Sequence, residues 1–423
     1  MHFDLRTAAL VCSAALTAGL VCAVPAAAAP TPTASGTVTP RPPARMSTVG
    51  GERLGLSGVQ VQAGAPALPA KLSSLSWIVS DAGTGQVLAA KNAHWALPPA
   101  STLKTLFADT VLPKIPTRAT HKVTDADLAG MGEGSSLVGV LPGQTYKVSD
   151  LWLGVFLRSG NDAVHVLASM NGGVAATVAQ MQAQAVKLGA GDTHVVSPDG
   201  YDMPGQVSSA YDLSLFARDG MKNADFARYA GTWKAEFPGG PNTKGKPFEI
   251  DNTDRMLMGI DGVPRYDGLI GVKNGYTTNA GNTLVVAARR GGRTVMATLM
   301  NPQDHALNAV YTEAAALLDW GFAADGKVTP VGSLDATAAV AAKHSAAAKA
   351  GSGGDSVNAP TKAAQAAVGG SGGTSGFGTL GWAGASGAGL VVFAAAAGSA
   401  LLLRRRRRAA RRRRPLPRIH GLD

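Results

Sequence analysis

The sequence has almost no cysteine. Of its 423 residues only Cys12 and Cys22 are cysteines, and both lie in an N-terminal segment that we expect to be removed. The mature chain would then have neither a disulfide framework nor thiol chemistry. The eight histidines show no metal-ligand spacing, and the 53 glycines form no P-loop or dinucleotide-binding motif. The sequence therefore implies no metal and no organic cofactor.

Outside one short segment the sequence also lacks a strong charge. The net charge is +11, but residues 404–423 hold ten arginines and one aspartate and so supply +9 of it. The rest of the chain is close to +2. A basic run beside an apolar span is typical of membrane topology and of contact with anionic lipid. We therefore expect no nucleic-acid partner.

The two ends of the chain predict export and anchoring. Residues 1–29 combine Arg6, an apolar run and the small-residue stretch PAAAAP, which is typical of a signal peptide cleaved near Ala29; the alternative is a retained anchor. Residues 380–403 carry no charge and would span about 36 Å as a helix, enough for a bilayer core of about 30 Å. The following arginines, in 404–423, predict a short cytoplasmic tail and an outward-facing domain at the cell membrane.

Composition divides the exported part into three. Residues 30–70 are rich in Pro, Thr, Ala and Gly, which predicts a disordered leader. Residues 323–379 are dominated by Ala, Gly, Ser and Thr, which predicts a flexible stalk. Residues 71–322 remain, about 250 in number, and are sufficient for one sizeable core.

The pattern within 71–322 predicts a mixed α and β domain. Short β-type runs around Gly-rich turns indicate hairpins, and apolar stripes at helical spacing indicate helices. The expected hairpins are 75–92 and 283–301, and the expected helices are 101–111, two within 147–170 broken at RSGN, 174–190 and 305–322. Because strands lie at both ends of the domain, we expect one mostly antiparallel sheet covered by helices.

The stretch PPASTLKTLF places a hydroxyl and an amine on one helical turn. Ser101 and Lys104 are three residues apart just after two prolines, so their side chains share a face of the first turn. An ordinary cap followed by a surface charge gives the same pattern. A serine becomes a useful nucleophile only with a base beside it, so the pair is also a candidate catalytic dyad.

Two further motifs carry the same kind of ambiguity. RSGND places Ser159 and Asn161 at a helix break, where these residue types are also expected as caps and turns. LIGVKNGYTT places Lys273, Asn274 and Gly275 in a β-type run, with the lysine and the glycine on one face. Glycine in a strand indicates close approach of a ligand or of another backbone. An edge strand with an incidental glycine gives the same sequence pattern.

In this order, with gaps of about 55 and 110 residues, the three motifs form the signature of penicillin-binding proteins and class A β-lactamases. The runs DAGTGQVLAAKNAHWALPPASTLK, SGNDAVHVLA, KLGAGDTHVVSPDG and GVKNGYTTNAGNTL resemble the low-molecular-weight penicillin-binding proteins, the serine D-alanyl-D-alanine carboxypeptidases. The resemblance covers residues 71–322. It implies a β-lactamase/transpeptidase-like α+β fold, with an antiparallel sheet, covering helices and a helical lobe.

The resemblance also implies a role for each motif residue. Ser101 would be the nucleophile and Lys104 its base. Ser159 would relay protons to the leaving group, and Asn161 would hold the substrate backbone. The implied substrate is a peptidoglycan stem peptide whose terminal D-alanine is released, with β-lactam antibiotics as covalent inhibitors.

The remaining implied roles concern the β-type run. Lys273, with Asn274 and Gly275, would bind the terminal carboxylate of the peptide. The backbone N–H groups of Ser101 and Tyr276 would stabilise the oxyanion. The family usually has threonine where this chain has Asn274. The asparagine amide can also donate a hydrogen bond, but it is bulkier, so the substitution bears on substrate choice and on rate.

That departure leaves alternative functions of the same fold open. One is a peptidoglycan-binding protein with a weak or silenced site, and others are a D,D-endopeptidase or a β-lactamase. The last is disfavoured because no Glu-x-x-x-Asn run precedes the Lys273 strand to activate a deacylating water. Among other polar residues, we expect His165 to be packed rather than catalytic, and Asp199 and Asp202 to serve turns.

Overall fold

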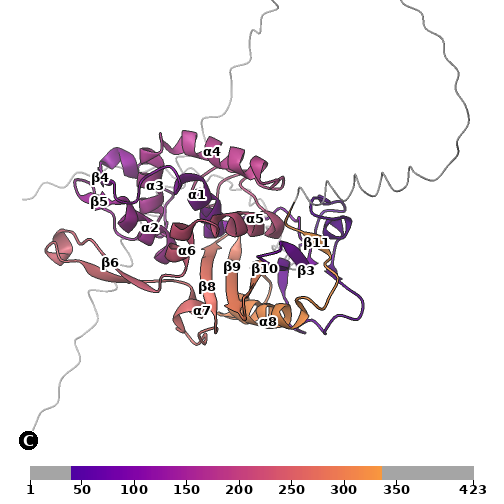
Figure 1. Ribbon diagram of the computed structural model, residues 1–423. Coiled ribbons are helices and arrows are strands. Elements are labelled where there is room, and N and C mark those ends of the chain that lie inside the picture. The colour runs from indigo at the N-terminus through magenta and orange to yellow at the C-terminus, as the bar shows by residue number, and fades with distance from the viewer. Residues whose placement is uncertain (1–39, 336–423) are drawn as a thin grey trace, which may run out of the picture. The chain divides into compact units, whose positions relative to one another are not determined.

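The computed structural model describes residues 40–335. An antiparallel sheet of seven strands forms the centre of this part of the chain (Figure 1). The strand order is β1-β3-β2-β10-β9-β8, with β11 also pairing with β3. These strands are β1 (Val59–Val61), β2 (Ser74–Asp81), β3 (Gln86–Lys91), β8 (Leu269–Thr277), β9 (Gly281–Arg290), β10 (Arg293–Pro302) and β11 (Gly332–Ser333). The predicted α+β architecture with one antiparallel sheet is confirmed.

A helical lobe is inserted between β3 and β8. It contains α1 (Lys104–Val111), α2 (Val148–Leu157), α3 (Asn161–Met170), α4 (Val174–Lys187), α5 (Ala210–Gly220) and α6 (Ala224–Ala230). Two small hairpins accompany it, β4 (Thr120–Lys122) with β5 (Thr145–Lys147), and β6 (Lys234–Phe237) with β7 (Phe248–Asp251). The closing helix α8 (Ala309–Ala324) lies on the other side of the sheet (Figure 1). The short helix α7 (Arg255–Met258) follows the lobe along the chain, and its Met256 joins the core beneath α8.

Both faces of the sheet are buried, so its central strands read as continuous apolar runs. Successive side chains along a strand point to opposite faces of the sheet, so neighbouring residues pack in different cores. Trp77 and Val79 of β2 pack in the core beneath α8, while Ile78 between them joins the core of the helical lobe. On β9, Val286 and Val285 divide in the same way. The sheet therefore separates two apolar cores.

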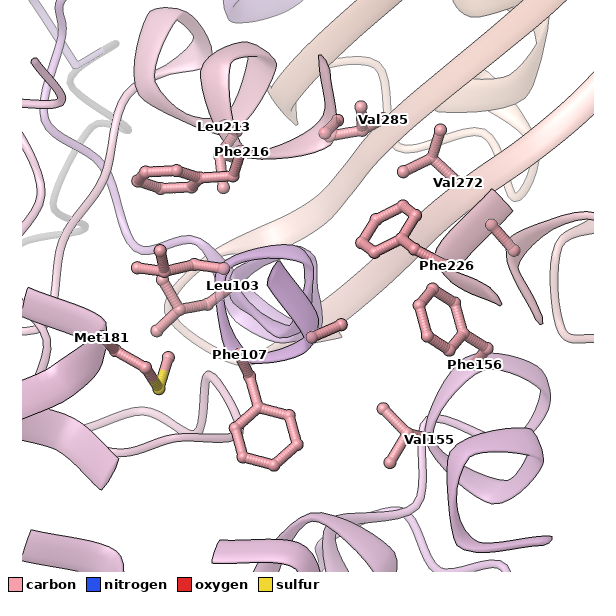
Figure 2. Packing of buried hydrophobic residues seen from close by; sticks show 14 of the residues in the cluster. Leu103, Phe107, Val155, Phe156, Met181, Leu213, Phe216, Phe226, Val272 and Val285 are labelled. Carbon is pink, nitrogen blue, oxygen red and sulfur yellow. The ribbon is translucent and has the colours of Figure 1, made fainter. Parts of the chain in front are cut away.

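The first helix is the centre of the lobe's core. Figure 2 shows Phe107 of α1 with Met181 of α4 on one side and Val155 of α2 on the other. Leu103 and Phe107 are fully buried, as are the other residues of α1 that face this core. Ordering of α1 therefore depends on the whole lobe, and this fixes the position of the residues at its start.

The predicted hairpins and helices are confirmed, with one refinement at the first helix. β2 pairs with β3, and β9 pairs with β10 around Gly291 and Gly292, both at positive φ as a tight two-residue turn requires. The helix predicted from Ser101 instead begins as a 3₁₀ turn, Ala100–Leu103, and continues as α1. A non-glycine residue at positive φ, Ala100, starts that turn.

The predicted boundaries of the domain are too narrow. In the leader predicted over 30–70, residues 52–55 form a 3₁₀ turn and β1 pairs with β3; in the stalk predicted over 323–379, β11 pairs with β3. The prediction of disorder is wrong for these residues. They are ordered by backbone pairing with β3 and by apolar side chains that join the cores, among them the buried Leu54, Val331 and Leu334.

The predicted signal peptide (1–29), the apolar span (380–403) and the basic tail (404–423) lie outside the described residues. Within residues 40–335, no helix has the length and apolar character needed to cross a bilayer.

A buried carboxylate joins the last helix to the start of the sheet. Glu313 of α8 accepts hydrogen bonds from the backbone N–H and the hydroxyl of both Ser73 and Ser74. Its side chain is almost completely buried. Hydrogen bonds to a charged group contribute about 1.5–3 kcal/mol each, and they fix the register at which β2 begins.

We therefore expect Glu313→Gln to lower the free energy of unfolding by about 1–3 kcal/mol, because the amide has one acceptor oxygen for four donors. Urea denaturation monitored by circular dichroism measures this change. The matched control is Glu249→Gln, which removes the carboxylate from an exposed ion pair with Lys234 and should change stability by less than about 0.5 kcal/mol. Equal losses in the two variants would contradict this role of Glu313.

Candidate active site

The turn that carries Ser101 is held tightly from two sides. The Thr283 hydroxyl on β9 donates to the carbonyl of Pro99, 2.9 Å away. On the other side, a Cβ placed on Gly200 would lie only 1.9 Å from the Ala100 carbonyl oxygen, and Gly200 also has a positive φ. Ser101 is therefore presented from a backbone that neighbouring segments fix in place, with Ala100 at φ 50° just before it.

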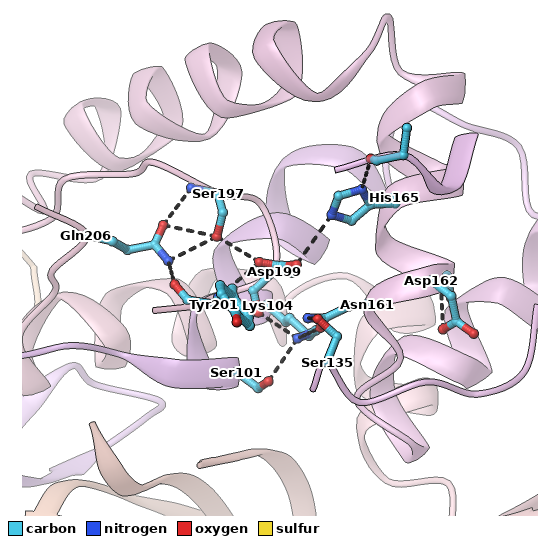
Figure 3. A network of polar contacts seen from close by, with 12 residues as sticks. Ser101, Lys104, Ser135, Asn161, Asp162, His165, Ser197, Asp199, Tyr201 and Gln206 are labelled. Carbon is cyan, nitrogen blue, oxygen red and sulfur yellow. Dashed lines mark hydrogen bonds and ion pairs between the residues drawn. The ribbon is translucent and has the colours of Figure 1, made fainter. Parts of the chain in front are cut away.

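Lys104 lies beside this serine and is 1% exposed. Its Nζ is 2.8 Å from Ser101 Oγ, 2.7 Å from Asn161 Oδ1 and 2.6 Å from the Asp199 carbonyl oxygen (Figure 3). Burial lowers the pKa of Lys104 to about 8, while the charges of Asp199 and Asp162 act in the opposite direction. A neutral amine here donates its two N–H groups to Asn161 and Asp199, which leaves its lone pair directed at the serine hydroxyl.

The break between α2 and α3 brings two more motif residues to the same place. Asn161 begins α3, and its Nδ2 donates to Ser135 Oγ at 2.9 Å while its oxygen accepts from Lys104. Asp162 next to it accepts the backbone N–H groups of Val138, Gly139 and Val140. Both side chains are buried. The helix start thus organises the loop that borders the site.

Ser159 occupies an unusual position in that break. Its φ is 56°, and its buried Oγ has no hydrogen-bond partner among the described residues. The side chain lines the same cavity as Ser101. A strained backbone and an unsatisfied hydroxyl both cost stability, and such costs concentrate at functional sites. The serine hydroxyl is therefore available to a group that enters the cavity.

A second layer of polar residues supports Lys104, and the sequence did not reveal it. His165 Nε2 lies 3.4 Å from Asp199 Oδ2, and Asp199 Oδ1 accepts from Ser197 Oγ and the backbone of Tyr201 (Figure 3). Burial raises the pKa of Asp199, but the hydrogen bond from His165 and the charge of Lys104 outweigh it and hold this pKa well below its usual range. The expected turn role is present, together with a fixed negative charge near the amine.

The strand β8 brings a second buried amine to the site. Lys273 is 2% exposed, and its Nζ donates to the carbonyl and to the side-chain oxygen of Asn274 at 2.8 and 3.0 Å. Burial lowers its pKa to about 7, with a further lowering from the charge of Lys104 and a partial offset from Asp254. Two amines therefore share one poorly hydrated site, and each disfavours the charged form of the other.

The side chain of Asn274 is engaged with the protein. Its Nδ2 lies 3.2 Å from the Thr253 carbonyl oxygen and 3.4 Å from Tyr311 Oη, and its oxygen accepts from Thr253 Oγ1 and Lys273. Both amide N–H groups thus face protein acceptors in this structure, and the role of Asn274 in binding the substrate carboxylate stays a prediction. The Asn274 side-chain oxygen also positions Lys273.

Gly275 lies against the nucleophile's backbone. A Cβ at this position would be 2.7 Å from the Ser101 nitrogen and 2.6 Å from Thr283 Oγ1. Only glycine lets β8 approach the serine turn this closely. The next residue, Tyr276, is exposed at the rim, and it lines the cavity together with Ser101. All the motif residues predicted from the sequence are therefore found around one site.

Two cavities meet at Ser101. The larger, of about 880 Å³, extends along β8 past Ser159 and Asn274 to Arg255. The smaller, of about 270 Å³, lies toward Asn161 and is bordered by Glu133, Tyr201 and Asp202. An extended chain can thus pass the nucleophile with one part in each cavity.

Comparison with known proteins gives one answer. The family model of the D-alanyl-D-alanine carboxypeptidases matches residues 60–304, more than half of the chain. The chain is 40% identical over 263 residues to D-alanyl-D-alanine carboxypeptidase DacB2 of Mycobacterium tuberculosis, which covers 61% of this chain and 85% of that protein. It is 31% identical over 270 residues to DacD of Escherichia coli, but covers only 64% of that protein's length.

Solved structures also resemble this chain. A crystal structure of a D-alanyl-D-alanine carboxypeptidase from Mycobacterium tuberculosis superposes with a TM-score of 0.59 at 39% identity, covering 65% of this chain and 99% of that one. The Streptomyces K15 DD-transpeptidase gives a TM-score of 0.55 at 28% identity, covering 61% of this chain and all of that one. This chain belongs to the D-alanyl-D-alanine carboxypeptidase family.

The charge of Asp199 near Lys104 leads to a prediction about the amine. Replacing it by asparagine keeps the shape and removes the negative charge that favours the ammonium form. We expect Asp199→Asn to lower the pKa of Lys104. An NMR titration of the ¹³Cε resonance in lysine-labelled protein, assigned with Lys104→Arg, measures it.

The control for this prediction is Asp127→Asn. Asp127 is also buried and also pairs with a histidine, His121, but it is not among the charges that act on Lys104. That variant should leave the titration of Lys104 unchanged. An unchanged or higher pKa in Asp199→Asn would show that the aspartate does not act on the amine electrostatically.

Proposed function

We propose that this protein is a serine D-alanyl-D-alanine carboxypeptidase that removes the terminal D-alanine from peptidoglycan stem peptides through an acyl-enzyme at Ser101. The observation that carries the proposal is the contact between Ser101 Oγ and the buried Nζ of Lys104 at 2.8 Å. A hydroxyl at this distance from an amine of lowered pKa is an activated nucleophile. Membership of the family supports the same activity.

Acylation follows from the positions of the groups. Neutral Lys104 takes the proton of Ser101 while Oγ attacks the carbonyl carbon of the penultimate D-alanine. The backbone N–H groups of Ser101 and Tyr276 stabilise the negative oxygen that forms. Ser159 then passes the proton from Lys104 to the departing amine of the terminal D-alanine, and the C–N bond breaks. Water hydrolyses the ester by the reverse proton path and restores Ser101.

The two lysines require different protonation states for this chemistry. Lys104 must be neutral to act as a base, and Lys273 must be charged to attract the substrate carboxylate. In the free protein burial lowers the pKa of both amines, and the charge of Lys104 lowers that of Lys273 further. A carboxylate beside Lys273 favours its charged form, and the resulting repulsion lowers the pKa of Lys104. Substrate binding thus generates the base.

Substrate recognition is assigned to the larger cavity. The terminal carboxylate lies near Lys273, whose Nζ is oriented by Asn274, and the guanidinium of Arg255 contributes a further positive charge to the lining. Asn161 lies on the other side of Ser101 and is assigned to the backbone of the stem peptide. A β-lactam antibiotic, which presents a reactive carbonyl and a carboxylate, occupies the same positions and acylates Ser101.

Ser101→Ala tests this function directly. The full chain should form a stable adduct with fluorescent penicillin and should release D-alanine from a pentapeptide ending in D-Ala-D-Ala. We expect Ser101→Ala to abolish the adduct and to reduce release by at least about 10⁴-fold, as loss of an activated nucleophile does. Ser149→Ala, a remote serine at the start of α2, is the control and should retain both activities.

Other outcomes identify the alternatives. Rapid turnover of the antibiotic would favour a β-lactamase, and cleavage of cross-linked rather than free peptides would favour an endopeptidase. If the parent protein forms no adduct and releases no D-alanine, the chain is a wall-binding protein with a silent site.

Localisation is proposed from the sequence pattern of the two ends. The N-terminal segment exports the chain, and residues 380–403 anchor it with the catalytic domain on the wall side and the arginines inside. Truncation after residue 379 should release active protein into the medium, whereas truncation after residue 403 should leave it with the membrane. Cell fractionation with penicillin labelling measures both, and identical distributions of the two truncations would contradict the anchor.

A further inference from the structure

A cluster of three metal-ligating side chains lies apart from both cavities at Ser101. His94 comes from the segment between β3 and the serine turn, Asp192 follows α4, and Asp212 lies in the first turn of α5. One donor atom from each lies within 4.8 Å of the others. None of the three lines the cavities next to the nucleophile. No spacing motif indicates this cluster, because its three residues are far apart in the chain.

The imidazole of His94 is oriented as a ligand. Its Nε2 lies 2.9 Å from the Val49 carbonyl oxygen, and this carbonyl accepts a proton that Nε2 carries. Nδ1 faces Asp192 Oδ2 at 2.6 Å. In the neutral ring a lone pair therefore points at a carboxylate, an arrangement that needs a proton or a cation between the two atoms. Backbone carbonyls hold metal-binding histidines in the same way.

The second carboxylate is deeply buried and only half satisfied. Asp212 is 0% exposed. Its Oδ2 accepts from the Asp192 N–H and from Thr193 Oγ1, but its buried Oδ1 has no hydrogen-bond partner among the described residues. Within residues 40–335, no lysine or arginine forms an ion pair with Asp192 or Asp212. Among these residues Asp192 forms an ion pair only with the His94 ring, and the buried Oδ1 of Asp212 has no partner. An unsatisfied buried carboxylate oxygen is costly, and a cation beside it removes that cost.

We propose that His94 Nδ1, one oxygen of Asp192 and Oδ1 of Asp212 bind a single divalent metal ion, with Zn²⁺ as the best match. Imidazole nitrogen and carboxylate oxygen are zinc ligands at about 2.0–2.2 Å, which places tetrahedral donors about 3.4 Å apart. The donors reach that spacing by small rotations of the side chains. Asp192, whose side chain is 14% exposed, provides the path for the ion.

The ion has a structural role. It joins three segments: the loop before the serine turn, the segment that follows α4, and the first turn of α5. The Ser209 hydroxyl, 2.8 Å from Asp192 Oδ2, orients that carboxylate, as outer partners of metal ligands do. Binding to the folded state alone raises stability by mass action. The site is independent of the chemistry at Ser101.

The experiment titrates Zn²⁺ into the chelator-treated, dialysed full chain in competition with a chromophoric chelator. We expect one ion per chain with a dissociation constant of about 1 μM or tighter, which corresponds to about 8 kcal/mol. Co²⁺ should give the visible d–d bands of a tetrahedral site with nitrogen and oxygen ligands. His94→Gln and Asp192→Asn should each weaken binding by at least about 100-fold and abolish the bands.

His121→Gln is the matched control. His121 also lies against an aspartate, Asp127, at 2.9 Å, but it is 28% exposed and has no third ligand. This variant should bind Zn²⁺ as the parent does. If His94→Gln does not fold, the affinity of Asp192→Asn for Zn²⁺ tests the proposal by itself, because Asp192 is less buried and its replacement disturbs folding less. Absence of stoichiometric binding, or equal affinity in all variants, would overturn the proposal whatever the outcome of penicillin labelling.

Discussion

The burial of Lys104 is the constraint on which the rest of the site depends. Removing a primary amine from water is unfavourable for its charged form, and this is what makes the amine useful as a base. The cost is limited because three oxygens lie within 2.6–2.8 Å of Nζ. Each oxygen comes from a different part of the lobe, so the base exists only when the serine turn, α3 and the loop at Asp199 are assembled together.

The backbone around this amine accepts strain to achieve that assembly. Ala100 and Ser159 are non-glycine residues at positive φ; Ala100 directly precedes Ser101, and Ser159 itself has a proposed role in catalysis. Close approach is obtained where a side chain is absent, at Gly200 against the Ala100 carbonyl and at Gly275 against the Ser101 nitrogen. The opposite core beneath α8 is apolar throughout its buried cluster, and it can offset costs that the site imposes.

Much of this architecture could be predicted from local patterns. Period-two and helical apolar patterns gave the hairpins and helices, and the order of three short motifs indicated the fold and the site. The patterns failed where order depends on contacts from distant segments. β1 becomes ordered only against β3, and the Asp199–His165 pair forms only when the loop at Asp199 meets helix α3. The hydrogen bonds from the Asn274 amide to Thr253 and Tyr311 depend on the positions of α7 and α8, which no local sequence pattern encodes.

The paired lysines also link function to stability. Their folded-state pKa values, about 8 and about 7, lie below the ordinary value of 10.5, so between these limits the unfolded chain binds more protons than the folded one. Stability therefore rises with pH across this window, and the full penalty of burying both ammonium groups is present below pH 7. Asp199 and Asp162 reduce that penalty by favouring the charged form of Lys104, and by the same interaction they oppose its action as a base. The site thus balances two demands on one amine. In the proposed mechanism, a carboxylate beside Lys273 shifts this balance toward the neutral form of Lys104, which is the form that acts as a base.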